Sequence, residues 1–324
     1  MTDATFNVLV IGAGAIGAFY DSPESENMLT HGHAFSAHPG FHLIGFVDCD
    51  LERARSAAAL WCCKAFGSIE EAFQQEAVDV VCVAVPAEMH YPILKAISGY
   101  PLKAVFTEKP LTKTVAEAKE IVSIFAENQV PVCVNYRRCF VPEFEALRDK
   151  IKAGNFGKYM TGSGCYGKGF LHNGSHLINL LGYLVGDIKQ HRILSQESDC
   201  FADDPSISLV VGFDADRLFT MLHVNCNHYT VFEADLFFER GRVRITDTGF
   251  RIQYQKTVDS DIFKGYRFLA VSEDLGTSLG RSLYHSADNI YEHLTVGRPL
   301  KCTLQDAFMT MLVCNKVQGD LSQA

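Results

Sequence analysis

The sequence predicts two α/β domains. Residues 1–135 are expected to form a doubly wound domain with a parallel sheet. Residues 136–324 are expected to form an α+β domain built on a large, mainly antiparallel open sheet. In the first part, short apolar runs alternate with helical patterns, which is typical of βαβ units. In the second part, several strand-like runs follow one another. A length of 324 residues fits two domains.

Five buried strands are expected in the first domain. They are the apolar runs at residues 8–11, 43–47, 78–85, 104–107 and 130–134. Continuous apolar runs of this length are typical of strands that are buried on both faces of a parallel sheet. Between them, Ser68 with Glu71 and Thr114 with Glu117 have capping-box spacing, which marks the start of a helix.

The second domain begins with a helix over residues 142–153, which ends at Gly154. Strands are expected at residues 160–166, 206–213, 218–224, 230–238 and 243–245, and two helices at residues 282–294 and 304–317. Residues 239–241 have the composition of a hairpin turn. The open face of this sheet is expected to serve as a wall for a ligand or for another subunit, and the last helices could pack back on the first domain.

Composition and charge exclude several classes of protein. The net charge of −9 and the absence of Lys/Arg runs disfavour a nucleic-acid partner. No run approaches the roughly 18 apolar residues of a membrane helix, and the first residues do not resemble a signal peptide. We therefore expect a cytoplasmic protein with no membrane partner.

The 11 cysteines are expected to be reduced, small apolar residues. Cys49, Cys82, Cys133 and Cys226 lie in apolar or strand-like runs, and Cys62 and Cys63 are neighbours that cannot easily bridge each other. No Cys-x-x-Cys pair is present, so a cysteine zinc site is not expected.

A glycine-rich turn follows the first strand. Gly12, Gly14 and Gly17 form a G-x-G-x-x-G motif, in which the glycines permit a tight turn, a close backbone approach to a pyrophosphate and close helix packing. The start of the following helix supplies free N–H groups to the anion. Asp48 ends the second strand, where a carboxylate accepts ribose hydroxyls and repels a 2′-phosphate. The pattern predicts dinucleotide binding, with NAD preferred over NADP.

Asp48 lies well beyond the usual spacing of about 20 residues after such a motif. The polar residues 21–27 therefore indicate an insertion, after which a helix resumes near Thr30. The insertion could act as a lid over the cofactor or be a passive surface segment. His31 and His33 follow it with a spacing that could bind a metal. Because no third ligand is evident, we interpret them as solvated or packed histidines and expect no metal.

Two further segments carry candidate catalytic residues. Lys109 follows the strand at 104–107, at the sheet edge where ligands bind in doubly wound domains. A lysine there can hydrogen-bond a substrate hydroxyl and promote its deprotonation, although a lone lysine after a strand is usually a surface charge. Further on, His176 and Asn179 share one face of a helix whose opposite face carries leucines. A histidine can exchange a proton near neutral pH.

Taken together, these motifs resemble the glucose-fructose oxidoreductase/inositol dehydrogenase/MocA (Gfo/Idh/MocA) family over nearly the whole chain. The matching segments are Gly12-Ala13-Gly14-Ala15-Ile16-Gly17, Asp48, Val83-Ala84-Val85-Pro86 with His90, Glu108-Lys109-Pro110, Asn135-Tyr136-Arg137-Arg138, and Gly174-Ser175-His176 with Asn179. The resemblance implies a Rossmann domain, bound NAD(P), sugar or cyclitol substrates, and homodimers or homotetramers formed through the second sheet.

The resemblance also assigns roles to residues. It implies cofactor contacts by Gly12, Gly14, Ala15, Ile16, Gly17, Asp48, Ala84, Pro86, His90, Glu108 and Lys109. It implies substrate contacts by Lys109, Asn135, Arg137, His172, His176 and Asn179, with Lys109, His176 and His172 as the catalytic candidates. A structural role in salt bridges at the domain junction is an equal alternative for Arg137 and Arg138.

Two positions depart from the family. Many members carry aspartate four residues before the site histidine and again three residues after it, where this chain has His172 and Asn179. Two negative charges are lost relative to that pattern. We hypothesise that an anionic substrate, such as a sugar acid or a nucleotide sugar, is better tolerated. The hypothesis fails if other carboxylates line the pocket around His172.

The sequence thus favours an NAD-dependent oxidoreductase. It would transfer a hydride between nicotinamide and a ring hydroxyl or ketone carbon of a sugar, a sugar derivative or a cyclitol. Two alternatives stay open: a non-catalytic NAD-binding sensor or regulator, which the two missing acids favour, and an NAD-dependent glycosidase.

Overall fold

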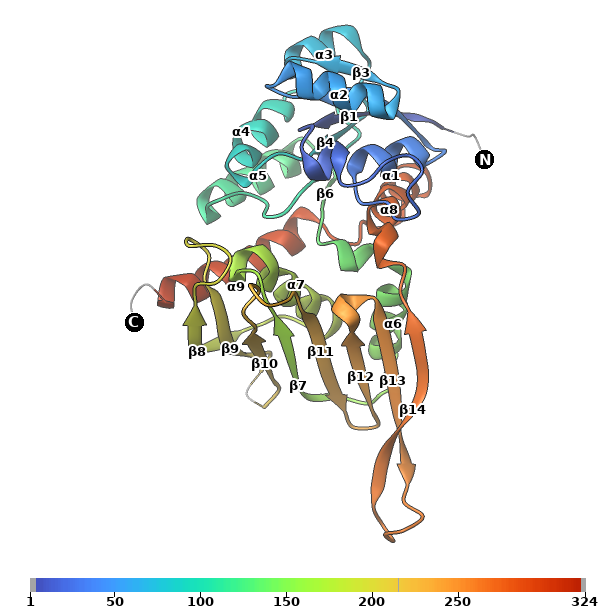
Figure 1. The fold of residues 1–324 in the computed structure, drawn as a ribbon, viewed down its shortest axis with the longest axis vertical. Helices are drawn as coiled ribbons and strands as arrows, with labels where there is room; N and C mark the ends of the chain where they lie inside the picture. Colours follow the sequence, from blue (N-terminus) through green and yellow to red (C-terminus); the bar gives the residue numbers. More distant parts are fainter. Residues whose placement is uncertain (1–3, 215, 322–324) are drawn as a thin grey trace. The chain divides into compact units, whose positions relative to one another are not determined.

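The computed structural model describes residues 4–214 and 216–321. The chain forms two compact units (Figure 1). Unit 1 comprises Met1–Phe140 and Gly280–Met311, and unit 2 comprises Val141–Leu279 and Leu312–Ala324. Unit 1 therefore includes a helical segment from the end of the chain.

The sheet of unit 1 has six parallel strands. They are β1 (Phe6–Ile11), β2 (Phe41–Val47), β3 (Lys64–Phe66), β4 (Val80–Val83), β5 (Ala104–Thr107) and β6 (Val132–Val134), in the order β3-β2-β1-β4-β5-β6. All residues of β4, β5 and β6 are buried, as their continuous apolar runs predicted. This order confirms the predicted doubly wound domain. Only the short edge strand β3 was not predicted.

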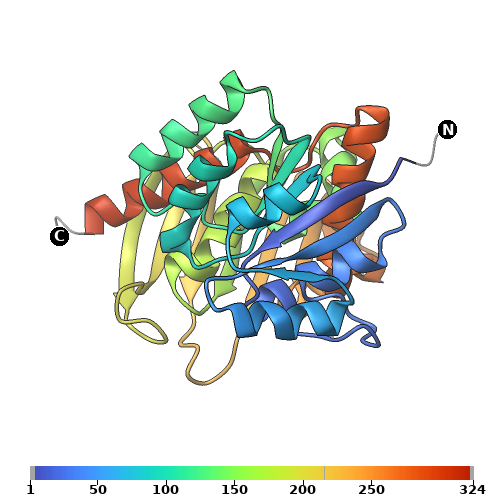
Figure 2. The ribbon, with the colours of Figure 1, turned by 90° about the horizontal axis from the view of Figure 1, so that it is seen from above.

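Helices flank this sheet (Figure 2). They are η1 (Ala15–Phe19), α1 (His31–Ala37), α2 (Leu51–Trp61), α3 (Ile69–Gln75), α4 (Ala87–Ile97), α5 (Val115–Glu127), η2 (Arg137–Phe140) and α8 (Ser282–Val296). The capping box predicted at Thr114 and Glu117 is complete. At the start of α3, Ser68 caps the backbone N–H of Glu71, but the Glu71 side chain accepts from Gly67. The predicted break in the first helix is confirmed, because α1 resumes after its N-cap Thr30.

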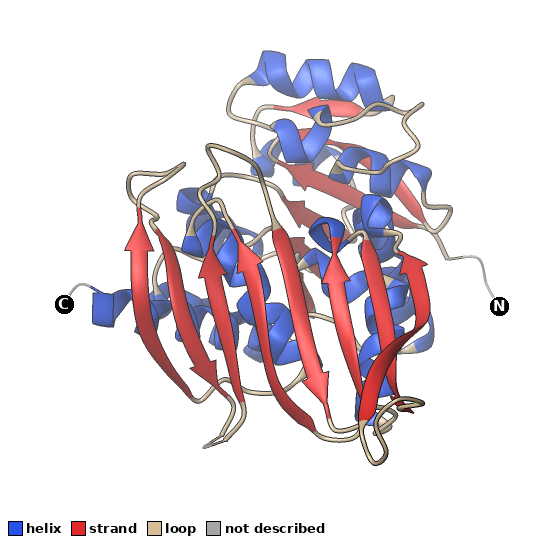
Figure 3. Cartoon of the chain, turned by 60° about the horizontal axis from the view of Figure 1, so that its bottom comes forward, coloured by secondary structure: helices blue, strands red, loops and turns tan. Residues whose placement is uncertain are grey.

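Unit 2 is built on an eight-stranded sheet. Its strands are β7 (Tyr159–Tyr166), β8 (Gln190–Glu197), β9 (Ser206–Gly212), β10 (Leu218–His223), β11 (Phe232–Phe238), β12 (Gly241–Thr246), β13 (Arg251–Asp259) and β14 (Arg267–Gly276). The order is β14-β13-β12-β11-β7-β10-β9-β8, and only β7 and β10 pair in parallel. This confirms the predicted mainly antiparallel sheet. Its helices lie over one face and leave the other open (Figure 3).

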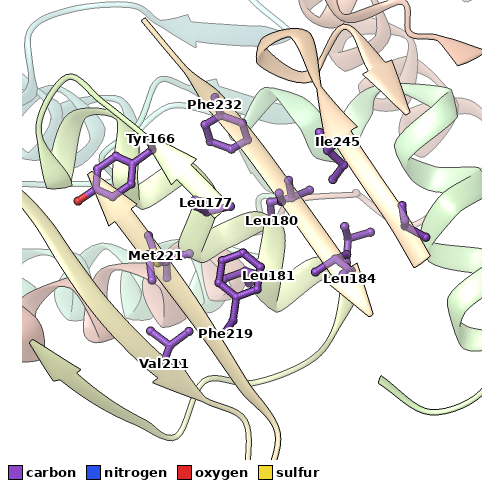
Figure 4. Packing of buried hydrophobic residues seen from close by; sticks show 14 of the residues in the cluster. Tyr166, Leu177, Leu180, Leu181, Leu184, Val211, Phe219, Met221, Phe232 and Ile245 are labelled. Atoms are coloured by element: carbon purple, nitrogen blue, oxygen red, sulfur yellow. The ribbon is translucent and has the colours of Figure 1, made fainter. Parts of the chain in front are cut away.

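Leucines of α7 (Ser175–Leu184) form the centre of the unit 2 core. Leu177, Leu180, Leu181 and Leu184 are buried against side chains of the sheet, including Tyr166, Phe219, Met221 and Phe232 (Figure 4). Burying each leucine stabilises the fold by roughly 1.5–3 kcal/mol. Helices α6 (Pro142–Lys152) and α9 (Leu304–Leu321) add Phe144, Leu147, Cys314 and Val317 to the same core. The predicted leucine face is therefore the face that fixes α7 on the sheet.

The expectation that all cysteines are reduced is wrong for one pair. Cys200 and Cys226 form a disulfide, while the other cysteines are free. Because β8 and β10 both run antiparallel to β9, they point in the same direction and end on the same side of the sheet. The chain segments that follow them therefore bring two cysteines together that are 26 residues apart in sequence.

No helix within the described part of the chain is both long and apolar enough to cross a membrane.

Candidate functional site

The glycine turn of unit 1 leaves open space at its middle glycine. Gly12 has φ +103°, and a Cβ there would collide with the backbone of Ala84. A Cβ on Gly17 would collide with the carbonyl oxygen of Gly12. Gly14 differs, because a Cβ there would have no neighbouring atom within 4 Å. Two glycines are thus needed for the turn itself, and the third leaves room for a ligand to approach the backbone, as a pyrophosphate requires.

Asp48 is held beside this turn by four hydrogen bonds. Its Oδ2 accepts the backbone N–H of Ala13 at 2.9 Å and Nε of Arg53 at 3.0 Å. Its Oδ1 accepts the backbone N–H of Asp50 at 2.9 Å and Nη2 of Arg53 at 2.6 Å. Burial opposes the charged form, but the bonds from Arg53 and the backbone outweigh it and hold the pKa of Asp48 below its usual value. Sequence reasoning found Asp48 but missed Arg53, whose only signal was its place in the first turn after the N-cap Asp50.

A second cluster surrounds Glu108 at the carboxyl end of β5. Its Oε1 lies 2.9 Å from Nε2 of His31 and accepts Nδ2 of Asn135 at 2.7 Å. Burial opposes the charge on Glu108, yet the contacts with His31 and Asn135 and the charge of Lys109 lower its pKa. Nδ1 of His31 and Oδ1 of Asn135 are buried without a hydrogen-bond partner among the described residues. These two atoms leave hydrogen-bonding capacity beside Glu108.

Two other predicted residues lie near the ends of β4 and β6. The ring nitrogens of His90 lie 2.9 Å from the carbonyl oxygen of Val85 and 2.5 Å from that of Pro110. The ring therefore bridges the segments that follow β4 and β5. Arg137 in η2 makes no salt bridge with a described acid; burial lowers its pKa and the nearby Glu108 charge raises it. Its predicted substrate contact stays a prediction.

The insertion is bonded at both ends. The Asp21 carboxylate accepts the Leu29 N–H and the Thr30 hydroxyl, and it lies 2.9 Å from Nδ1 of His33. The N–H of Met28 bonds the carbonyl of Gly280. Its role as a lid stays a prediction.

His31 and His33 are packed rather than solvated. Both are buried, and each has a carboxylate partner. Within residues 4–214 and 216–321, neither belongs to a group of three side chains that could hold a metal ion.

In unit 2, the remaining predicted residues occupy one continuous helical segment. His172 lies in η3 (Phe170–Gly174), a single helical turn that leads directly into α7 with His176 and Asn179. Asn179 is buried, and His176 is half-buried. The predicted site residues thus fall into two groups, one in each unit.

Asp204 is a carboxylate that sequence reasoning missed. It accepts the backbone N–H groups of Leu171 and His172, each at 2.8 Å. Three residues before it in the chain, Phe201 has its ring 4.8 Å from that of His172. A negative charge therefore lies beside His172 after all, although it comes from a loop distant in sequence. Asp204 contacts this segment through backbone N–H groups, so the hypothesis of an anionic substrate stays a prediction.

Comparisons with known proteins agree with this arrangement. Residues 6–136 match the Gfo/Idh/MocA model, described as an oxidoreductase family with an NAD-binding Rossmann fold. Inositol 2-dehydrogenase of Corynebacterium glutamicum (strain R) is 32% identical over 160 residues, which are 48% of this chain and 44% of that protein. A dTDP-3,4-didehydro-2,6-dideoxy-alpha-D-glucose 3-reductase of Streptomyces violaceoruber is 27% identical over 124 residues, 38% of this chain and 36% of the reductase. The chain therefore matches less than half the length of these relatives.

Solved structures resemble the chain over both units. UDP-N-acetylglucosamine 3-dehydrogenase GnnA from Acidithiobacillus ferrooxidans superposes with a TM-score of 0.78 at 15% identity, covering 96% of each chain. The WlbA dehydrogenase from Bordetella pertussis, in complex with NADH and UDP-GlcNAcA, also gives 0.78 at 16% identity, covering 97% of this chain and 95% of WlbA. At this identity the likeness concerns the fold.

Proposed function

We propose that the chain is an NAD-dependent dehydrogenase of the Gfo/Idh/MocA oxidoreductase family, whose model its residues 6–136 match. It would act on a ring hydroxyl of a sugar, a sugar derivative or a cyclitol, or on the corresponding ketone. The observation that carries the proposal is the arrangement of unit 1. Its glycine turn, Asp48 and Glu108-Lys109 all lie at the carboxyl ends of parallel strands, where ligands bind in such sheets.

The residues of unit 1 suit a nicotinamide dinucleotide. The open space at Gly14 admits a pyrophosphate close to the backbone, and Asp48 is the candidate partner of the adenosine ribose. A carboxylate at that position disfavours a 2′-phosphate, which favours NAD over NADP. Glu108 and Lys109, which follow β5, would contact the nicotinamide end. When bound, the oxidised cofactor accepts a hydride at the nicotinamide C4 atom.

Lys109 and His176 would handle the proton. The substrate hydroxyl gives its proton to an imidazole nitrogen of His176, while Lys109 donates a hydrogen bond to the same oxygen. The hydrogen on the same carbon would leave with its electron pair as the hydride for the nicotinamide, so the C–O bond would become C=O and the charges would balance. Arg137, Asn135, His172 and Asn179 would orient the sugar ring. Curated relatives that act on inositol and on a dTDP-sugar support a substrate of this class.

We further propose that the protein is cytoplasmic and works as a homodimer or homotetramer through the open face of the unit 2 sheet. Apolar side chains are exposed on several of its strands, including Met160, Leu194, Leu218 and Leu222. Exposed apolar residues that gather on one face are typical of interaction sites.

Turnover tests the proposed function. The purified protein with NAD and a panel of inositols, free sugars and nucleotide sugars should produce NADH with at least one substrate. Lys109→Ala and His176→Ala should each lower kcat by about 100-fold or more. Lys113→Ala serves as the control. Lys113 is an exposed lysine on the loop after Lys109, and it pairs with Glu88.

The alternatives give different results in the same assay. NADH binding without turnover of any panel member would instead support the sensor. Cleavage of a glycosidic bond without net NADH would support the glycosidase.

A further inference from the structure

The carboxylate of Asp48 has no acceptor position left for a ribose. A carboxylate offers about four lone-pair sites. Ala13, Asp50 and the two Arg53 nitrogens already use all four in the structure. A ribose hydroxyl can therefore bond Asp48 only if one of these donors leaves.

Only Arg53 can leave without disturbing the backbone. The Ala13 N–H belongs to the glycine turn, between Gly12 and Gly14. The Asp50 N–H belongs to the N-cap of α2, where the Asp50 side chain also accepts the N–H groups of Glu52 and Arg53. The Arg53 side chain, in contrast, is 43% exposed and reaches Asp48 from the first turn of α2.

Arg53 also changes the charge that a cofactor meets. Its guanidinium bonds both oxygens of Asp48 side by side, which is the geometry that arginine uses for carboxylates and phosphates alike. The other charge near it is Asp50, whose Oδ2 lies 3.9 Å from Nη1. The paired cation therefore reduces the repulsion that Asp48 alone would exert on a 2′-phosphate, while Asp50 adds a negative charge at the longer distance.

We propose that Arg53 determines how this chain discriminates between NAD(H) and NADP(H), an inference that rests on the proposed function. With NAD(H), the Asp48–Arg53 pair opens and the freed carboxylate accepts the ribose hydroxyls. With NADP(H), the guanidinium turns from Asp48 to the 2′-phosphate and offers it two parallel hydrogen bonds. Asp48 alone would favour NAD(H) over NADP(H). Arg53 reduces this difference in affinity, so that both cofactors bind.

Binding titrations test this without any substrate. The full chain is titrated with NADH and with NADPH, following the cofactor fluorescence. The wild-type Kd values should lie within about tenfold of each other. Arg53→Ala should raise the Kd for NADPH by about tenfold or more and leave the Kd for NADH unchanged or lower. Asp48→Asn should lower the Kd for NADPH.

Arg55→Ala is the matched control, because Arg55 lies on the same helix, pairs with Glu52 and is 59% exposed. It should move neither Kd, and thermal melts check that every variant is folded. A wild-type preference for NADH above about 100-fold would overturn the inference. So would an equal change of both Kd values in Arg53→Ala, which would indicate a structural role. If the wild type bound neither cofactor, the proposed function itself would fail.

Discussion

Nε2 of His31 lies 2.9 Å from Oε1 of Glu108, so the first helix after the insertion contacts the Glu-Lys-Pro segment directly. Both side chains come from the carboxyl-terminal side of the parallel sheet, and the His31 side chain is fully buried. The insertion therefore affects the surroundings of Glu108. The residues that lengthen the chain between Gly17 and Asp48 also deliver a partner to the acid beside Lys109.

His31→Phe should lower the free energy of unfolding by about 1–3 kcal/mol, because Glu108 then loses a buried hydrogen-bond partner. The new ring can keep the edge-to-face contact with Phe106, whose ring centre lies 5.1 Å away. Urea unfolding measures the change, with His42→Phe at an exposed position of β2 as the control. Equal stability of His31→Phe and the wild type would show that the contact contributes nothing.

Gly12 and Gly14 should respond differently to a side chain. Gly12→Ala should lower the melting temperature, because its φ of +103° disfavours any side chain and its Cβ meets Ala84. Gly14→Val should leave the melting temperature nearly unchanged, because Gly14 has φ −82° and open space around it. Its NADH binding should nevertheless be lost. Normal NADH binding by Gly14→Val would place the pyrophosphate elsewhere.

Asp48 should make stability depend on acid pH. Despite the cost of burial, bonds from Arg53 and the backbone hold its pKa below 3.8. A carboxyl group whose pKa is lower in the folded protein than in the unfolded chain stabilises the fold at any pH above the unfolded-state pKa. This contribution is lost as the pH falls through the folded-state pKa, because the unfolded chain takes up the proton at a higher pH. Asp48→Asn should therefore be less stable than the wild type near pH 7, and the difference should shrink below about pH 4.

Urea midpoints across this pH range measure the effect. Asp261→Asn, at an exposed position between β13 and β14, is the control. A difference between Asp48→Asn and the wild type that stays constant with pH would show that the charge of Asp48 is not involved.

Asp204→Ala should lower turnover without weakening NADH binding. The change leaves the N–H groups of Leu171 and His172 without their acceptor, so the turn that leads into α7 loses its anchor. We expect a loss of about 1–3 kcal/mol in stability and a fall in kcat. Asp204→Asn, which keeps one oxygen, should be intermediate. Weaker NADH binding by both variants would contradict a role confined to unit 2.

Reduction of the Cys200–Cys226 disulfide should destabilise unit 2 by about 3.5 kcal/mol, the free energy expected from the chain entropy of a loop whose ends are 26 residues apart. Thermal melts with and without reductant measure this for the wild type and for Cys200→Ser. Cys49→Ser, at an exposed free cysteine, should keep the response to reductant. If alkylation labels both Cys200 and Cys226 in the native protein without reductant, the disulfide is absent.

Local patterns in the sequence were sufficient for most of the secondary structure. Buried parallel strands are continuously apolar, and the glycine motif, Thr114 and Thr30 mark where helices begin. The strands β8, β13 and β14 were not predicted, because many of their residues are exposed and polar and they alternate only weakly. Strands of this kind form because a neighbouring strand pairs with them, and that neighbour is not visible in the local pattern.

Sequence patterns alone were enough to infer the doubly wound domain, the glycine turn, Asp48, the Glu108-Lys109 segment and the leucine face of α7. Each depends on residues that are close in the chain, so spacing and periodicity reveal it. The partners of these residues become visible only in the folded chain: Arg53 bonds Asp48, His31 contacts Glu108, Asp204 bonds the backbone of His172, and Cys200 pairs with Cys226. These contacts arise from strand order and loop direction, which bring distant segments together, and it is they that set the charge and hydrogen-bonding capacity of the candidate site.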